Sequence, residues 1–193
     1  MTVAFVLGNG RSRLAVDPQQ ELMGRGRIYG CNAIYREFMP QVLVSTDKPI
    51  SDQIQIEGIS ERVEHWTRRP LPDSKSKKIE RPYYGMSSGP VAISRAALDG
   101  HSHIYFLGFD LGSPDGLLNN IYGSTEFYKS NTDKATYAGN WIYQINQISR
   151  DFRQTLFFRV MGPESTAVTF ENKWKNVETI TMEQFKKVIN KLS

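Results

Sequence analysis

An unbroken apolar run of five residues, Val3–Leu7, lies near the start of the sequence and stops at Gly8-Asn9-Gly10. Apolar residues without polar alternation predict a strand that is covered on both faces, as strands in parallel sheets are. Glycines directly after such a strand let the backbone turn tightly. The run therefore predicts the first strand and first turn of an α/β fold.

Similar signals recur along the chain. Short buried strands are expected at 27–29, 41–45, 62–66, 103–109 and 155–161. Helices are expected at 49–56 and 138–151, from a Ser87 cap with Pro90 at the first helical position to Gly100, and after a Thr181 cap. Strands that alternate with helices or loops predict α/β architecture. We therefore expect one Rossmann-like domain over residues 1–193, a mainly parallel sheet flanked by helices.

Two segments lack any periodicity. Residues 67–86 hold six Lys or Arg, two acids and three prolines, and residues 111–135 are rich in Gly, Ser, Asn and Tyr. We expect irregular loops in both, forming a mobile lid over the carboxyl edge of the sheet. The charges of the first segment favour a solvated surface, with an electrostatic cover for a phosphate as the alternative.

Composition limits the class of protein. A length of 193 residues suits one domain, and 39% hydrophobic with 23% charged residues fits a folded chain. The net charge of +4 permits an anionic ligand. The lone Cys31 leaves no internal disulfide and fits a reducing compartment. The N-terminal apolar run is too short for a signal peptide or a membrane span, so we expect a cytoplasmic protein.

Two classes of site have little support. The histidines, His65, His101 and His103, lack ligand spacing, and one cysteine cannot form a zinc site, so we expect no metal. No nucleic-acid motif accompanies the modest positive charge, and we expect no nucleic-acid partner.

Polar residues follow several of the expected strands, where parallel sheets bind ligands. The first turn and Ser12 after it offer backbone N–H groups to a phosphate or polar sugar, or form a simple βα turn; Arg13 replaces the third glycine of a dinucleotide fingerprint. Asn32 suits a base or ribose edge, or a turn. Asp47 and Asp110 suit a ribose hydroxyl, a metal or a helix cap.

Two further sets of residues can contact a ligand. Ser87, Ser88 and Gly89 can bind a carboxylate or phosphate, or simply cap the helix that follows. Tyr122 and Tyr128, in the second irregular segment, can donate hydrogen bonds to a leaving phosphate without a metal, although loop tyrosines more often serve packing.

The ordered series VLGNGRS, GCNAIY, VSTD, MSSGPVAISRAALDG and HIYFLGFD resembles the bacterial lipooligosaccharide sialyltransferases. It also resembles a wider group of Rossmann-like proteins, the motility-accessory or hydroxymethylpterin-pyrophosphokinase-like proteins. The resemblance spans residues 3 to 165, because MGPES looks like the family's closing strand and turn. It implies a single Rossmann-type domain with a lid, no required metal or other cofactor, and a CMP-activated sialic acid as donor.

The resemblance also implies roles for single residues. Gly8, Asn9 and Gly10 would line the nucleotide site, and Asn32 would contact the donor. Ser88 with Gly89 would hold its phosphate or sugar carboxylate, while Gly108 and Asp110 would close the site beneath the cytidine. Tyr122 and Tyr128 are the nearest candidates for the lid tyrosines that stabilise the leaving phosphate.

The general base departs from the sialyltransferase pattern. The family places a histidine where this chain reads TYAGNWIY, and no histidine follows His103. Asp133 is an alternative base. We expect a metal-independent glycosyltransferase with an unknown acceptor, and a homo-oligomer. The alternatives are a Mg²⁺-dependent pyrophosphokinase-like enzyme that uses Asp47 and Asp110, or a non-catalytic nucleotide-binding domain.

Overall fold

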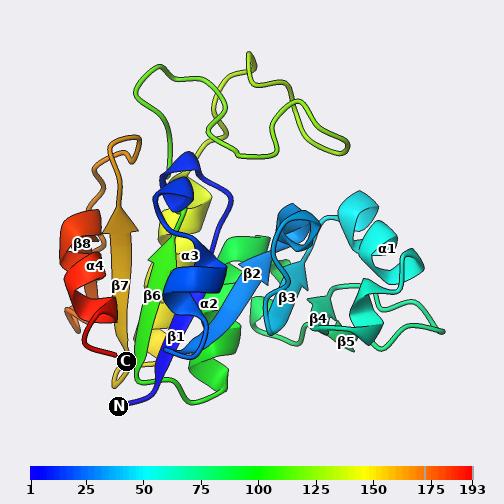
Figure 1. Cartoon of the computed structure of the whole chain (residues 1–193), viewed down its shortest axis with the longest axis horizontal. Helices are drawn as coiled ribbons and strands as arrows, with labels where there is room; N and C mark the ends of the chain where they lie inside the picture. The colour runs from blue at the N-terminus through cyan, green and yellow to red at the C-terminus, as the bar shows by residue number, and fades with distance from the viewer. Residues whose placement is uncertain (172, 193) are drawn as a thin grey trace.

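The computed structural model describes residues 1–171 and 173–192. In these ranges eight strands form one wholly parallel sheet in the order β5-β4-β3-β2-β1-β6-β7-β8 (Figure 1). The strands are β1 (Val3–Leu7), β2 (Arg27–Cys31), β3 (Val42–Ser45), β4 (Glu64–Thr67), β5 (Lys77–Lys78), β6 (His103–Leu107), β7 (Leu156–Met161) and β8 (Val177–Thr181). The α-helices are α1 (Lys48–Ile56), α2 (Ser88–Leu98), α3 (Gly139–Asp151) and α4 (Met182–Ile189).

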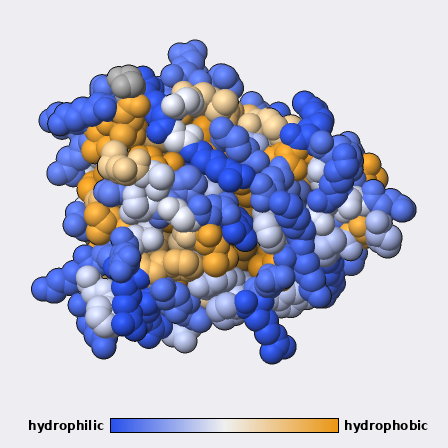
Figure 2. All heavy atoms as spheres, turned by 90° about the horizontal axis from the view of Figure 1, so that it is seen from below, coloured by the Kyte–Doolittle hydropathy of each residue, from blue (hydrophilic) through white to orange (hydrophobic). Residues whose placement is uncertain are grey.

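Short helical turns complete the connections. They are η1 (Arg11–Ala15), η2 (Pro18–Leu22), η3 (Asn32–Arg36), η4 (Ile59–Glu61) and η5 (Tyr83–Gly85). None of the helices in the described ranges has the length and apolar content needed to cross a membrane. Figure 2 shows the end of the molecule where both termini lie; hydrophilic side chains cover much of it, with apolar groups between them.

Both faces of the sheet are covered, as the apolar run predicts. Phe5 and Leu7 of β1 point to one face and belong to a buried cluster with residues of η2, η3, α1 and α4. Ala4 and Val6 point to the other and pack with α2 and α3. The Rossmann-like α/β fold is thereby confirmed, and each side of β1 contributes to a separate buried cluster.

The order of the strands creates a switch point between β1 and β6. From β1 the chain builds the sheet outward through β2, β3, β4 and β5, and α2 then returns it to the other side of β1. Leu7 at the end of β1 pairs with Leu107 at the end of β6. In open parallel sheets the crevice at such a reversal is where ligands bind.

The two irregular segments differ from each other in the structure. Residues 111–135 are irregular as expected, with one antiparallel bridge from Leu117 to Lys134, and they project beyond the carboxyl ends of the strands (Figure 1). In the basic segment, β5 pairs with β4, and Ile79, Tyr83 and Met86 are buried beside α2. A two-residue strand has no detectable periodicity, and the surrounding charges concealed these apolar anchors.

The structure differs from the sequence-based prediction at two further places. β8 was not expected, because its polar sequence and half-exposed position at the sheet edge leave no buried pattern. Helix α2 begins at Ser88, which puts Pro90 third rather than first, and the Ser87 side chain makes no capping hydrogen bond. The Thr181 cap of α4 is confirmed, with a reciprocal capping box to Gln184.

A histidine lies fully buried in β4. Nε2 of His65 lies 2.6 Å from Oγ of Ser45, and its Nδ1 lies 2.7 Å from Oγ of Ser76. Burial lowers the pKa of His65 to about 4, because the charged ring would lose its hydration. The imidazole is therefore a neutral member of a buried hydrogen-bond chain.

This environment predicts a pH-dependent stability. In the unfolded chain the pKa of His65 is near its ordinary value of 6.5, so between pH 6.5 and about 4 the unfolded state binds more protons than the folded state. The free energy of unfolding should fall by about 3 kcal/mol as the pH decreases through this window. Urea unfolding of the wild type and His65→Gln at several pH values measures the difference in slope; equal slopes would contradict the prediction.

Candidate functional site

A cavity of about 510 Å³ lies at the carboxyl ends of the central strands, beneath the irregular segment 111–135. Its wall contains most of the residues expected at a nucleotide site. These are Gly8, Asn9, Gly10, Asn32, Asp47, Ser87, Ser88, Gly89, Gly108, Asp110 and Tyr128. The structure therefore brings together side chains from five separate connections of the chain.

The hydroxyl of Ser88 joins three of these connections. It donates to Oδ1 of Asn32 at 3.0 Å, accepts from the backbone N–H of Thr46 at 3.0 Å and lies 2.9 Å from Oγ1 of Thr46. Asn32 has a positive φ of 51°, which asparagine tolerates better than most residues. With Oδ1 bound to Ser88, the Nδ2 group of Asn32 makes no hydrogen bond within the described part of the chain and can donate to a ligand.

Glycines let two loops touch at the floor of the cavity. A Cβ on Gly8 would lie 2.8 Å from the carbonyl oxygen of Gly108, and a Cβ on Gly108 would lie 2.7 Å from that of Gly8. Gly108 also has a φ of +72°. Gly10 donates its N–H to the Gly108 carbonyl at 2.8 Å. The glycines are thus required by the contact between loops, in addition to any approach of a ligand.

Asp110 holds these loops together. Its Oδ2 accepts from the N–H of Ser12 at 3.0 Å, and its Oδ1 accepts from Oγ of Ser165 at 2.7 Å. Its carbonyl accepts from Nη2 of Arg159 at 2.9 Å and from the N–H of Thr166 at 2.8 Å. Both carboxylate oxygens are therefore bound by the protein, which makes Asp110 a structural junction in the wall.

Arg159, on β7, is fully buried beneath this junction. Besides the Asp110 carbonyl, its Nε donates to the carbonyl of Phe109 at 2.9 Å. Burial lowers its pKa to about 10, so the guanidinium still carries its charge at neutral pH. A buried cation thus fixes the backbone that follows β6.

Three candidate residues lie outside the cavity wall. Ser12 is buried and contributes its N–H to Asp110 rather than to the cavity. Asp133 is exposed, and its carboxylate accepts from the N–H of Ser130 at 3.0 Å. Tyr122 is buried behind the wall. A base at Asp133 and a leaving-group donor at Tyr122 therefore have no support from the geometry.

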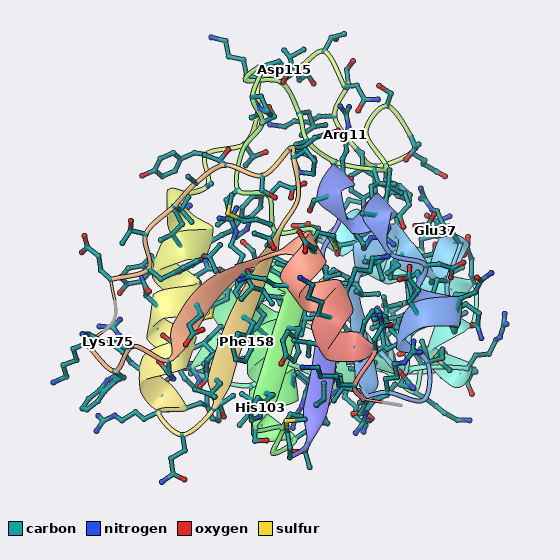
Figure 3. All side chains as sticks on the ribbon, turned by 60° about the vertical axis from the view of Figure 1, so that its left-hand side comes forward. Arg11, Glu37, His103, Asp115, Phe158 and Lys175 are labelled. Carbon is teal, nitrogen blue, oxygen red and sulfur yellow. The ribbon has the colours of Figure 1, made fainter. Side chains whose placement is uncertain are left out.

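Tyr122 connects the irregular segment 111–135 to the core through hydrogen bonds to Glu37 and Arg13. Its hydroxyl donates to Oε1 of Glu37 at 2.6 Å and accepts from Nη2 of Arg13 at 3.1 Å. Arg13 also contacts the same Glu37 oxygen at 2.6 Å. Burial opposes ionisation of Glu37, but these two hydrogen bonds outweigh it and lower the pKa of Glu37. In Figure 3 Glu37 lies to one side of the loop that carries Asp115, with Arg11 at the base of that loop.

Tyr128 does reach the cavity. Its hydroxyl accepts a hydrogen bond from the N–H of Ala33 at 3.3 Å, which leaves its own proton available. Burial raises the pKa of Tyr128 to about 12, so the phenol stays protonated at neutral pH. Among the expected tyrosines, this one has the position and protonation state of a donor to a developing negative charge.

Several lining residues were not identified from the sequence. They are Cys31, Thr46, Arg68, Phe109, Phe127, Lys129 and Trp141, among others. Thr46 and Arg68 directly follow β3 and β4, a position that was itself a usable signal. Phe127 and Trp141 come from a loop and a helix start, where no sequence rule indicates which side chain faces the cavity. Burial raises the pKa of Cys31 to about 12, which keeps it a neutral thiol.

The residues that line the cavity do not form a recognisable metal site in the described part of the chain. Within residues 1–171 and 173–192, no cluster of three or more His, Cys, Asp or Glu side chains is arranged to hold a metal ion. Asp47 and Asp110 both line the cavity, but the oxygens of Asp110 are already bound to Ser12 and Ser165.

Comparison with known proteins gives one informative result. No protein-family model matches the chain, and no curated protein matches its sequence. A solved structure of the sialyltransferase CstII from Campylobacter jejuni, in complex with the substrate analogue cytidine-5'-monophosphate, shares the fold with a TM-score of 0.50. The match covers 97% of this chain and 99% of that chain, at 14% identity. The chain therefore has a sialyltransferase-like fold.

The contact between the two glycine loops yields a stability prediction. Gly100→Ala introduces a Cβ at φ +85° with nothing within 4 Å, so it should cost about 1–2 kcal/mol from backbone strain alone. Gly108→Ala combines similar strain with a Cβ 2.7 Å from a backbone oxygen and should cost at least about 1–3 kcal/mol more. Urea denaturation of the pair measures the difference, and equal losses would disprove a tight loop contact.

Proposed function

We propose that this protein is a metal-independent glycosyltransferase whose donor is a nucleotide-activated sugar of the CMP class. The supporting observation is the cavity at the β1–β6 switch point, lined by polar strand-end residues, in a chain that shares its fold with a sialyltransferase solved with CMP. The acceptor is a hydroxyl-bearing molecule that enters the same cavity.

The polar wall would bind and orient the donor. Asn32 donates through Nδ2 to a base or sugar acceptor, while its Oδ1 remains held by Ser88. Ser87 and Gly89 lie beside Ser88 at the start of α2, where backbone N–H groups favour an anionic group. Gly8, Asn9 and Gly10 supply the loop on the other side of the crevice.

In this proposal Tyr128 stabilises the leaving group. When the bond between the sugar and the phosphate breaks, negative charge accumulates on the phosphate. A protonated tyrosine whose proton is not engaged by the protein can donate to that charge without reorganisation. This role needs no metal ion.

Asp47 is the best placed base in the wall. Asp47 occupies the N-cap position of α1, but its side chain makes no capping hydrogen bond. In the described part of the chain the carboxylate of Asp47 has no protein partner, whereas both oxygens of Asp110 accept a hydrogen bond from the protein. Asp47 would accept the proton of the acceptor hydroxyl as that oxygen attacks the sugar.

The structural role of Asp110, whose two oxygens each bind another loop, also weighs against the Mg²⁺-dependent phosphotransferase, which needs both aspartates as ligands. A non-catalytic nucleotide-binding domain remains the outcome if ligands bind and no transfer follows. The binding and turnover experiments below separate these possibilities.

Donor binding predicts a thermal shift. CMP at 100 times its Kd should add about 2.7 kcal/mol, or a Tm increase of about 5–10 °C, with equal shifts in EDTA and in Mg²⁺. Asn32→Asp keeps the acceptor for Ser88 but replaces the free donor with a carboxylate oxygen, so it should abolish most of the shift. Asn140→Asp, at an exposed position of α3, is the matched control. A shift seen only with ATP and Mg²⁺ would disprove the proposed donor.

Loss of the leaving-group donor predicts a defect in turnover rather than binding. Tyr128→Phe should reduce release of CMP from CMP-sialic acid by about 10²- to 10³-fold, with CMP affinity little changed. Tyr122→Phe removes a hydroxyl behind the wall and should lower stability while leaving turnover near that of the wild type. Equal turnover in both variants and the wild type would remove Tyr128 from the reaction.

A further inference from the structure

Arg68 is a cavity residue to which the proposed function assigns no role. It directly follows β4, and its guanidinium is held by two backbone carbonyls. Nε donates to the carbonyl of Tyr84 at 2.8 Å, and Nη2 donates to that of Met86 at 2.7 Å. The Met86 carbonyl directly precedes Ser87, and that of Tyr84 lies in the turn η5 just before it, so the arginine is fixed beside the wall that Ser87 and Ser88 line.

The charge of Arg68 is not balanced by a neighbouring acid. β3 and β4 end side by side, with Ser45 paired to Thr67, so Asp47 and Arg68 both follow the ends of neighbouring strands. Even so, in the described ranges Arg68 makes no ion pair, and its side chain is bound to carbonyls instead. The second cavity carboxylate, Asp110, is bound to Ser12 and Ser165.

The guanidinium retains hydrogen-bonding capacity. An arginine carries five N–H donors, and the two carbonyl bonds engage the Nε–H and one Nη2–H. The remaining donors match the paired oxygens of a phosphate or carboxylate, which arginine binds in a forked geometry. Because the side chain is already fixed, little rotamer entropy would be lost on binding.

We propose that Arg68 forms an anion-binding subsite in the cavity wall beside Ser87 and Ser88, which takes a phosphoryl or carboxylate group of a substrate. The identity of that substrate rests on the proposed function, but the subsite itself does not. The same anion chemistry can come from the donor phosphate or from an acidic second substrate.

Inorganic phosphate is the probe that tests the subsite, measured by calorimetry at low ionic strength on the full chain. Arg68→Gln should weaken phosphate binding by about tenfold or more, since a hydrogen bond to a charged group is lost. Arg68→Lys, which keeps the charge but not the fork, should restore part of the affinity. Arg69→Gln removes a charge from the adjacent, exposed residue outside the cavity wall and should bind as the wild type does.

A purely structural role gives a different pattern. If Arg68 only ties the carbonyls of Tyr84 and Met86, both variants should lower the Tm and leave phosphate affinity unchanged. That result would overturn the subsite, as would equal weakening by Arg69→Gln or a wild type that does not bind millimolar phosphate.

Cytidine and CMP identify the source of the anion. If the subsite takes the donor phosphate, Arg68→Gln should remove the preference of the protein for CMP over cytidine. If that preference survives while phosphate affinity falls, the subsite serves the second substrate. Arg68-dependent phosphate binding without any nucleotide binding would support the subsite and disprove the proposed donor, so the two failures are distinguishable.

Discussion

The cavity depends on the close approach of two backbones at the switch point. The loops after β1 and β6 meet at Gly8 and Gly108, where a Cβ on either residue would lie within 2.8 Å of the other's carbonyl oxygen. Asp110 and the buried Arg159 then fix the β6 loop to η1 and β7. Because these contacts are buried and made largely by backbone, the floor of the cavity is rigid. The protein groups that line the cavity above it are therefore held in fixed positions.

The irregular segment 111–135 covers the cavity and is bonded to the loop after β1 through Asn9, Arg11 and Arg13. Residues 32–37 hold it from a second side. At their start Asn32 is bonded to Ser88 of α2. The next N–H, that of Ala33, bonds the Tyr128 hydroxyl, and Glu37 at the other end accepts from Tyr122. Asn32, the proposed donor contact, and the residues that bond Tyr128 and Tyr122 thus all lie on or directly after the short helical turn η3. Any shift of this turn on ligand binding would move Tyr128 with it.

The fold was accessible from the sequence because buried parallel strands have a strong signature, and Val3–Leu7 matches its observed bounds. The same reasoning placed Gly8, Asn32 and Asp47 at one edge, since parallel strands share a carboxyl end. It missed β5 and β8, which are a two-residue strand and a half-exposed edge strand. Residues within the irregular segment 111–135 do not follow a strand end, so this reasoning could not place them. Which tyrosine of 111–135 faces the cavity depends on the Arg13–Glu37 pair, a contact between distant parts of the chain.

Partners, rather than positions, distinguish the two aspartates of the cavity. Each follows a buried strand, so the sequence alone predicts the same roles for both: a ribose contact, a metal ligand or a helix cap. Asp110 accepts from Ser12, and its second oxygen accepts from Ser165, so its charge is used by the fold. Asp47 lies at the start of α1 without a capping bond. A carboxylate needed for folding cannot also exchange a proton freely, because protonation would break the bonds that hold the loops. This difference is why we propose Asp47, rather than Asp110, as the acid–base group of the cavity in place of the histidine that the chain lacks.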